Sequence, residues 1–197
     1  MIDESISRVG TIGASDTKFV MLNYDTKTFT NWWAEKIGIK EPKNFDSVYI
    51  QAGTLLELPV LKAKFGTLEN LNIARTFTSK KYPRLKVNLD ADDGKCNYEV
   101  KCIKYEKAFD YQFKIDINYY RQVQVQMFVS GLKKSKLIVY GLRPADYDFD
   151  KLVVVEIDKE RIFEFPIEYD QEWIEKEYLP KLSYLCDCLD KNEIPKN

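Results

Sequence analysis

The sequence contains no histidine among its 197 residues. This absence excludes Ser–His and Cys–His nucleophilic pairs, and it excludes zinc sites with histidine ligands. Any catalysis must therefore depend on carboxylates, lysine, tyrosine or a metal ion bound through oxygen. The four cysteines are Cys96, Cys102, Cys186 and Cys188. Their spacing fits no common zinc or iron–sulfur pattern, so we expect reduced thiols.

Long apolar runs and low-complexity segments are also absent from the sequence. No stretch approaches the roughly 20 apolar residues that a membrane-spanning helix requires. The first ten residues, "MIDESISRVG", are too acidic and polar for a signal peptide. We therefore expect a cytoplasmic location and no membrane association. Glycine is scarce, at eight residues, and no linker interrupts the chain. We expect one domain over residues 1–197.

Neither sign of charge is in large excess, because the formal net charge is −1. A nucleic-acid-binding domain is usually basic overall, so this total argues weakly against DNA. Basic side chains nevertheless gather locally. One basic group consists of Lys80, Lys81, Arg84 and Lys86, and a second of Lys133, Lys134 and Lys136. A solvated surface is the simplest interpretation of each group.

Hydrophobic periodicity predicts an α/β protein with a mixed sheet. Helices are expected over residues 15–22, 30–38, 46–66, 117–131 and 170–191, with N-caps at Ser15, Asp46 and Asp170 and a kink at Pro59. Strands are expected over residues 71–79, 135–142 and 151–157, more weakly over 162–167, and as a hairpin over 88–102. Trp32 and Trp33 are expected in the core.

The hairpin sequence "NLDADDGKCNYEVKC" predicts a two-residue turn at Asp93-Gly94, with Asp92 opposite Lys95. Alternation along both strands then separates an apolar face from a polar one. The polar face would carry Lys86, Asn88, Asp90, Asn97, Glu99 and Lys101. Alternation alone favours the simpler interpretation, an ordinary wet face of a half-buried hairpin.

The chemistry of this polar face favours a site for a divalent cation. Asp90 and Glu99 lie diagonally on neighbouring strands, and the carbonyl of Val100 lies between Glu99 and Lys101. Carboxylate and carbonyl oxygens suit Mg²⁺ or Mn²⁺. Lys101 could hold or activate a water molecule beside the cation. Such a set hydrolyses phosphodiesters without histidine.

These residues also carry a resemblance to a known family. Asp90 followed by Glu99-Val100-Lys101 resembles the D…ExK core of the PD-(D/E)XK nuclease superfamily. Together with three further stretches, it resembles the YqaJ-like viral recombinase family, to which lambda exonuclease is related. The four stretches cover residues 8–131 in the order that this family shows. The resemblance implies a restriction-endonuclease-like α/β core, a mixed β-sheet flanked by helices.

Two of the further stretches lie in the first third of the chain. "RVGTIGASD", residues 8–16, is similar to the opening R-x-G-x-(I/G)-x-A-S motif, which in the family receives the 5′-phosphate end. The resemblance therefore implies that Arg8 and Ser15 hold that phosphate, beside a helix N-terminus that attracts anions. "GTLLE", residues 53–57, resembles the helical G-x-x-x-E motif and would add Glu57 to the metal site. Leu58 departs from the family pattern, in which proline follows the glutamate.

The third stretch, "YYRQVQVQMFVSG", resembles the family's Y-x-x-Q-V-Q-x-x-x-x-x-G helix. Its spacing places Tyr119, Gln122 and Gln126 on one helix face, while Val125 can face the sheet. The resemblance implies that Gln122 orients the attacking water and that Tyr119 contacts phosphate. Asn88 is a further candidate contact for the terminal phosphate. Candidates for contacts with the DNA backbone are Lys80, Lys81 and Arg84.

The resemblance implies a Mg²⁺-dependent (or Mn²⁺-dependent) DNA exonuclease that acts 5′→3′ on duplex ends in phage-type recombination. Its expected partners are double-stranded DNA ends and a single-strand annealing protein, in a bacterial or phage-infected host cell. It also implies a homo-oligomer, which would be a trimer if the assembly is lambda-like. Two alternatives remain open: an endonuclease of the same superfamily, and a protein that binds DNA ends without cleaving them.

Overall fold

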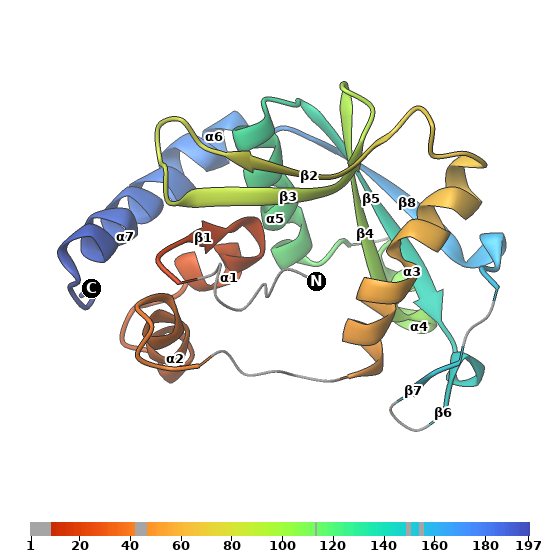
Figure 1. The fold of residues 1–197 in the computed structure, drawn as a ribbon, viewed down its shortest axis with the longest axis horizontal. Helices are drawn as coiled ribbons and strands as arrows, with labels where there is room; N and C mark the ends of the chain where they lie inside the picture. The colour runs from red at the N-terminus through yellow and green to blue at the C-terminus, as the bar shows by residue number, and fades with distance from the viewer. Residues whose placement is uncertain (1–8, 42–46, 113, 149–150, 154–155) are drawn as a thin grey trace.

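The structure is a computed structural model that describes residues 9–41, 47–112, 114–148, 151–153 and 156–197. Within these ranges, a six-stranded mixed sheet organises the fold (Figure 1). The sheet consists of β1 (Ile12–Gly13), β2 (Asn72–Thr78), β3 (Leu85–Asp92), β4 (Cys96–Lys104), β5 (Lys134–Leu142) and β8 (Ile162–Glu168). The strand order is β1-β3-β4-β5-β8, and β2 pairs with β3. β1 runs parallel to β3 and β4 parallel to β5, whereas the other pairs are antiparallel.

Helices and short turns of helix flank this sheet. They are η2 (Ala14–Asp16), α1 (Thr17–Val20), α2 (Lys27–Lys36), α3 (Val48–Phe65), α4 (Tyr105–Asp110), α5 (Ile117–Ser130), η3 (Pro144–Asp146), η4 (Lys159–Arg161), α6 (Gln171–Trp173), η5 (Ile174–Tyr178) and α7 (Leu179–Lys191). A separate two-stranded ladder pairs β6 (Tyr147–Asp148) with β7 (Lys151–Leu152). The predicted α/β class, with a mixed sheet between helices, is confirmed.

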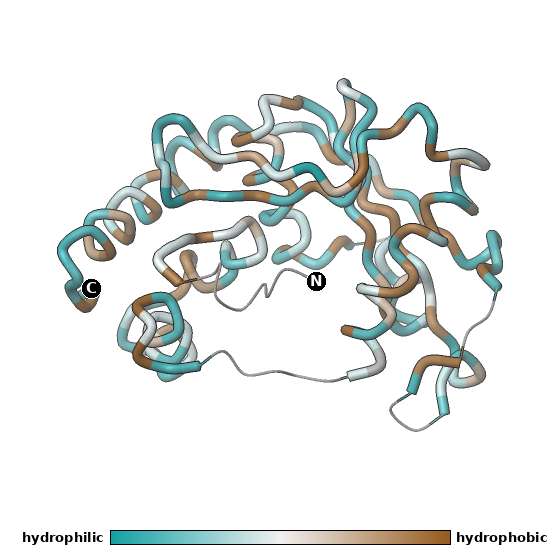
Figure 2. Tube along the Cα trace, viewed as in Figure 1, coloured by the Kyte–Doolittle hydropathy of each residue, from teal (hydrophilic) through white to brown (hydrophobic). Residues whose placement is uncertain are grey.

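The central strand β5 shows why helices cover both faces of the sheet. Its residues Leu137, Ile138, Val139 and Tyr140 are all fully buried. Ile138 and Tyr140 pack in a cluster with α3, whereas Leu137 and Val139 pack on the opposite face with α4 and α5. A strand that is buried on both faces reads as a continuous apolar run, as this one does. Figure 2 shows α7, at the edge of the molecule, with hydrophobic and hydrophilic residues mixed along its length.

A third cluster packs α1, α2 and α7 against β3 and α5. It contains Trp32 and Trp33, whose side chains are 4% and 2% exposed, so their predicted place in the core is confirmed. α5 also agrees with its prediction. Asp116 caps its first turn by accepting from the N–H of Asn118, and Gly131 ends it at φ +82°, a left-handed conformation that favours glycine.

The N-terminal helix differs from its prediction. Ser15 does not cap a helix over residues 15–22, because the backbone already turns at Ala14 as η2 and continues as the four-residue α1. The carboxylate of Asp16 accepts from the N–H of Gly13 at 2.8 Å and so closes the turn. The predicted helix N-terminus with free N–H groups is therefore reduced to a short, internally bonded turn.

Two other helix starts were misplaced. α2 begins at Lys27, where Thr26 accepts from the N–H of Phe29, and not near residue 30. Ser47 caps α3 by accepting from the N–H of Ile50, whereas the predicted cap, Asp46, lies outside the described residues. α3 continues through Pro59 to Phe65.

The hairpin forms, but its predicted turn is wrong. Backbone pairing joins Asp92 to Asn97 and Ala91 to Tyr98, so the loop spans residues 93–96. Asp93 is the reason, because its carboxylate accepts from the N–H groups of residues 95 and 96 and stabilises a wider loop. The register moves by two residues, and each side chain therefore keeps its predicted face.

The strand predicted over residues 151–157 was also wrong. Among the described residues there, only Lys151–Leu152 form a strand, in the small ladder with β6, and residues 154–155 lie outside the description. The weaker prediction over 162–167 is instead the sheet strand β8. Asp170 caps the last helical segment as predicted, by accepting from the N–H of Trp173. In the described ranges, no helix has both the length and the apolar character needed to span a membrane.

Candidate active site

Glu99 on β4 lies at the centre of a buried polar cluster. The predicted wet face of β4 was wrong, since Glu99 is 2% exposed and Asn97 is fully buried under α5. Oε1 of Glu99 accepts from Lys101 Nζ and from Gln122 Nε2, each at 2.5 Å. Oε2 accepts from Gln126 Nε2 at 2.5 Å. One carboxylate thus receives three side-chain donors, two of them neutral.

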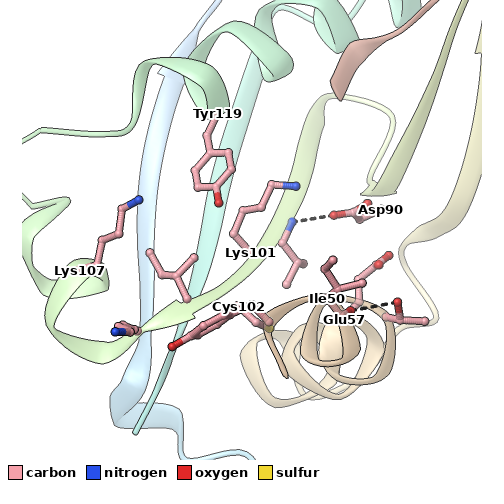
Figure 3. A pocket seen from close by; sticks show the side chains of 13 residues that line it. Ile50, Glu57, Asp90, Lys101, Cys102, Lys107 and Tyr119 are labelled. Atoms are coloured by element: carbon pink, nitrogen blue, oxygen red, sulfur yellow. Dashed lines mark hydrogen bonds between the residues drawn. The ribbon is translucent and has the colours of Figure 1, made fainter. Parts of the chain in front are cut away.

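Asp90 on β3 occupies the point where the hairpin opens. Backbone pairing between β3 and β4 ends at Ala91 and Tyr98. One residue further, Oδ2 of Asp90 accepts from the backbone N–H of Val100 at 2.7 Å, as the dashed line in Figure 3 marks. The carboxylate replaces the missing backbone partner, which fixes the side chain between the two strands.

Around Asp90, negative charge from the carboxyl groups exceeds the positive charge of Lys101. Burial raises the pKa of Asp90 well above its usual value, and the charges of Glu99 and Glu57 raise it further, against the opposing effect of Lys101. Burial and Glu99 likewise raise the pKa of Glu57. Burial alone would lower the pKa of Lys101, but Glu99 and Asp90 outweigh it and raise that pKa. Lys101 is therefore an ammonium group, and among the described residues it is the cation that opposes the raised pKa values of both Asp90 and Glu57.

A pocket of about 580 Å³ opens on the α3 and α4 side of this cluster. Figure 3 shows Glu57 reaching it from α3, Asp90 from β3, Lys101 from β4 and Tyr119 from α5. The Lys101 ammonium lies 5.4 Å from the centre of the Tyr119 ring. Gly53, four residues before Glu57 on α3, lines the same pocket, so the two residues share one face of the helix.

α4, which had no sequence prediction, forms another wall of this first pocket and contributes Lys107. Its position depends on Gly141 in β5. A Cβ at Gly141 would lie 2.8 Å from the Tyr105 ring and 3.0 Å from its Cα. The glycine in "VYGL" therefore allows α4 to lie close against the sheet.

A second pocket, of about 480 Å³, opens toward the N-terminal turn. Asp90 and Lys101 line both pockets, so they mark the junction between them. The other residues that line the second pocket include Ser15, Thr76, Lys86, Asn88, Glu99 and Gln122. The structure thus brings Ser15 and Asn88 beside the carboxylates, as the phosphate-binding prediction requires.

The remaining predicted DNA contacts have different environments. Arg8 lies outside the described residues. Lys80 and Lys81 are exposed and line neither pocket. Arg84 bonds Asp190 at 2.6 Å and the carbonyl of Gly10 at 2.7 Å, so its guanidinium holds the N-terminal turn against α7. We therefore leave Arg84 out of the proposed backbone contacts.

Two residues of the site were missed as functional candidates. Lys86 is exposed in the second pocket and has no ion-pair or hydrogen-bond partner for its ammonium among the described residues. Gln126 is 1% exposed and bonds Glu99 directly. The i, i+4 spacing of Gln122 and Gln126 was the available signal for the second residue.

The donor set is suited to a hard divalent cation, although the carboxylates do not converge as predicted. Among the described residues, no three aspartate, glutamate, cysteine or histidine side chains form a group that could hold a metal ion. The reason is that Glu99 turns toward Lys101 and the glutamines. Asp90, Glu57 and Val100 nonetheless line one pocket and offer only oxygen atoms of the kind that Mg²⁺ and Mn²⁺ prefer.

Comparison with known proteins places the chain in a family. Residues 6–133, nearly two thirds of the sequence, match the YqaJ-like viral recombinase domain. The chain belongs to this family, which confirms the resemblance seen in the sequence. No curated protein matches the chain.

Solved structures share the fold at low sequence identity. An alkaline exonuclease from Laribacter hongkongensis is 19% identical, with a TM-score of 0.73 over 98% of this chain and 94% of that one. The same exonuclease in complex with dAMP gives 0.72 at 19% identity, over 95% and 92%. A phage-related exonuclease from Haemophilus somnus 129PT is 15% identical, with 0.66 over 92% and 94%.

Proposed function

We propose that this protein is a metal-dependent DNA exonuclease that removes nucleotides from duplex ends in the 5′→3′ direction, acting as a single nuclease domain. The observation that carries the proposal is the junction of the two pockets. Asp90, Glu99, Lys101 and Gln122 meet there from β3, β4 and α5. Family membership and the exonuclease structures with the same fold support it, as does the dAMP bound by one of them.

The oxygen donors suggest how a cation would be held. Asp90, Glu99, Glu57 and the Val100 carbonyl are the proposed ligands for Mg²⁺ or Mn²⁺. When bound, this cation would polarise the phosphoryl oxygen and lower the pKa of its water. Glu99 would contribute through Oε1, whose donors Lys101 and Gln122 reach the pockets and can change partners.

The protein side chains supply positioning. Because Lys101 is an ammonium group, it donates a hydrogen bond, and it would position and activate the attacking water while stabilising negative charge on the phosphoryl group. Gln122 would orient the same water without changing the charge. Tyr119, at the wall of the first pocket, would contact a phosphate of the DNA strand.

The second pocket is the proposed site of the terminal 5′-phosphate. Ser15 and Asn88 offer a hydroxyl and an amide, and Lys86 offers an ammonium group that has no partner among the described residues. Arg8 remains a proposed partner from the sequence resemblance. Exposed Lys80 and Lys81 are proposed to contact the DNA backbone, which would make binding sensitive to salt.

A direct test is cleavage of linear duplex DNA with Mg²⁺ and with EDTA. We expect degradation with Mg²⁺ only, and loss of at least about a hundredfold in Lys101→Ala, as removal of one charge-stabilising donor usually costs. Lys95→Ala, at the exposed hairpin turn, is the matched control. Equal rates for the wild type and Lys101→Ala would refute the proposed chemistry.

Two further substrates separate the alternatives. An exonuclease leaves supercoiled plasmid intact, whereas an endonuclease of the same superfamily nicks it. A protein that only binds DNA ends retards linear DNA and degrades neither substrate. Equal rates on 5′-phosphorylated and 5′-hydroxyl ends would remove the role given to the second pocket.

The biological setting is proposed from the family alone. A viral recombinase family supports recombination in the cytoplasm of a bacterial or phage-infected cell, with a single-strand annealing protein as the partner that uses the exposed 3′ strand. A homo-oligomer, trimeric if lambda-like, is the proposed assembly. Size-exclusion chromatography with light scattering, with and without duplex DNA, tests it.

A further inference from the structure

The buried end of the Glu99 carboxylate has a support of its own. Gln126 Nε2 donates to Oε2 of Glu99 and also to the backbone carbonyl of Asn88, at 2.5 and 2.9 Å. Gln126 therefore joins α5 to β4 and β3 at once. It is 1% exposed and lines neither pocket, so its amide is closed off from any ligand there.

The side-chain amide of Asn97 fixes the orientation of the Gln126 amide. Oε1 of Gln126 accepts from Asn97 Nδ2 at 2.9 Å, and Asn97 Nδ2 also donates to Ser135 Oγ at 3.1 Å. Ser135 Oγ in turn donates to the Asn97 carbonyl. Asn97 is fully buried and Ser135 is 1% exposed. Because Asn97 presents a donor to Oε1, the NH₂ group of Gln126 must point toward Glu99.

The two oxygens of Glu99 therefore have unequal freedom. Oε1 is bonded by Lys101 and Gln122, both of which line pockets. Oε2 is bonded by a buried amide that the fold holds at its other end. We propose that Gln126, oriented by Asn97, is a positioning residue that anchors Oε2 so that Oε1 is presented to the metal and substrate.

This inference rests on the proposed nuclease function, and α5 offers a matched control. Gln124 is also fully buried, donates to the Glu168 carbonyl and accepts from the N–H of Asp170. Gln124→Met and Gln126→Met each remove one buried amide from the same helix, two residues apart. Only the second removes a contact with Glu99.

The experiment measures three quantities for both variants. They are Mn²⁺ affinity of the DNA-free protein by electron paramagnetic resonance, kcat and KM on linear duplex, and the thermal midpoint. We expect Gln126→Met to bind Mn²⁺ at least tenfold more weakly and to lose kcat with little change in KM, as loss of a supporting contact behind a ligand does. Gln124→Met should keep its Mn²⁺ affinity and its kcat near those of the wild type. Its loss of thermal stability should be comparable to that of Gln126→Met.

The network gives an independent check through Asn97. Asn97→Ser should weaken Mn²⁺ binding less than Gln126→Met, and the double variant should be no weaker than Gln126→Met alone, because both act through one contact. If Gln126→Met does not fold, Asn97→Ser against Gln124→Met carries the same test.

The possible outcomes separate the two proposals. If Gln124→Met and Gln126→Met change Mn²⁺ affinity equally, or neither changes it, Gln126 has only a structural role and the inference is refuted. If the wild type neither binds Mn²⁺ nor cleaves DNA, the proposed function itself fails. A wild type that does both, with loss confined to Gln126→Met, supports the inference.

Discussion

Asp90→Asn is expected to stabilise the metal-free protein while it abolishes cleavage. The carboxylate of Asp90 is half-buried near Glu99 and Glu57, with Lys101 as the opposing charge, and these surroundings raise its pKa. Asparagine removes the negative charge but keeps an oxygen that can accept from the N–H of Val100. The hairpin geometry is preserved, and only the unfavourable charge is lost.

The size of the effect follows from the charge balance. Among the described residues, Lys101 is the cation that opposes the raised pKa values of Asp90 and Glu57, so removal of the Asp90 charge relieves both its burial and its repulsion by Glu99 and Glu57. Single stabilising substitutions commonly contribute about 0.5–2 kcal/mol, and we expect Asp90→Asn to fall within this range. For a chain of this length, that corresponds to a rise of about 1–8 °C in the thermal midpoint.

The effect should depend on pH with a definite sign. A carboxyl group whose pKa is raised on folding contributes most to stability below its unfolded pKa, about 3.9, and loses this contribution as pH rises through the folded pKa. The melting curves of the wild type and Asp90→Asn in EDTA should therefore converge near pH 4 and separate toward pH 8. Differential scanning fluorimetry over this range measures the difference.

Asp93→Asn is a control with the opposite sign. Burial alone would raise the pKa of Asp93, but hydrogen bonds from the backbone N–H groups of Lys95 and Cys96 and from Tyr98 outweigh it and lower that pKa. Its stabilising contribution is present above the unfolded pKa and is lost as pH falls, so Asp93→Asn should destabilise at neutral pH.

Addition of Mn²⁺ should reverse the order of the thermal midpoints of the wild type and Asp90→Asn. A ligand at a hundred times its Kd stabilises the native state by about 2.7 kcal/mol. The wild type should gain this amount, whereas Asp90→Asn, which lacks a proposed ligand, should gain much less. An Asp90→Asn protein that melts below the wild type in EDTA at pH 8 would refute the charge imbalance inferred at this site.

Other variants test separate parts of the structure. Lys86→Ala should raise KM for 5′-phosphorylated duplex about tenfold, or about 1.4 kcal/mol, and leave KM for 5′-hydroxyl duplex unchanged. Arg84→Ala should lower the thermal midpoint and leave the salt dependence of DNA binding unchanged, since its guanidinium is engaged within the protein. Gly141→Ala should cost about 1–3 kcal/mol in urea unfolding, because the new methyl group meets Tyr105. Ala74→Gly should stabilise by about 0.5–1 kcal/mol by relieving a φ of +52° in β2.

Local patterns predicted most of the elements, but their ends depended on contacts that no local pattern records. The apolar runs of β5 and the spacing of α5 were sufficient, because each element's own residues determine it. The predicted hairpin register was wrong because the Asp93 carboxylate accepts hydrogen bonds that stabilise a wider loop than an Asp-Gly pair predicts. The strand prediction for "KLVVV", residues 151–155, was wrong for a different reason. Its described residues pair with β6 and not with the main sheet, a choice that depends on tertiary neighbours.

The site shows the same division between local and long-range information. The resemblance found Asp90, Glu99, Lys101 and Gln122, and the structure brings these four together. It could not show that the polar face of β4 is buried, because burial there comes from α5, which follows β4 in sequence and lies over Glu99. For this reason the sequence placed Gln126 on the polar face of its helix but could not show that its side chain is buried.

The choice of neutral donors around Glu99 has a physical consequence for the whole site. An arginine at position 126 could bond the carboxylate more strongly, but it would cancel the negative charge that attracts a divalent cation. Glutamine fixes the same oxygen and leaves the charge in place. Asp90 and Glu57, with raised pKa values, then remain short of positive charge. The amide groups hold the Glu99 carboxylate in a fixed position without adding positive charge. Because no second buried cation lies among the described neighbours, the negative charge of the site remains available to a divalent cation.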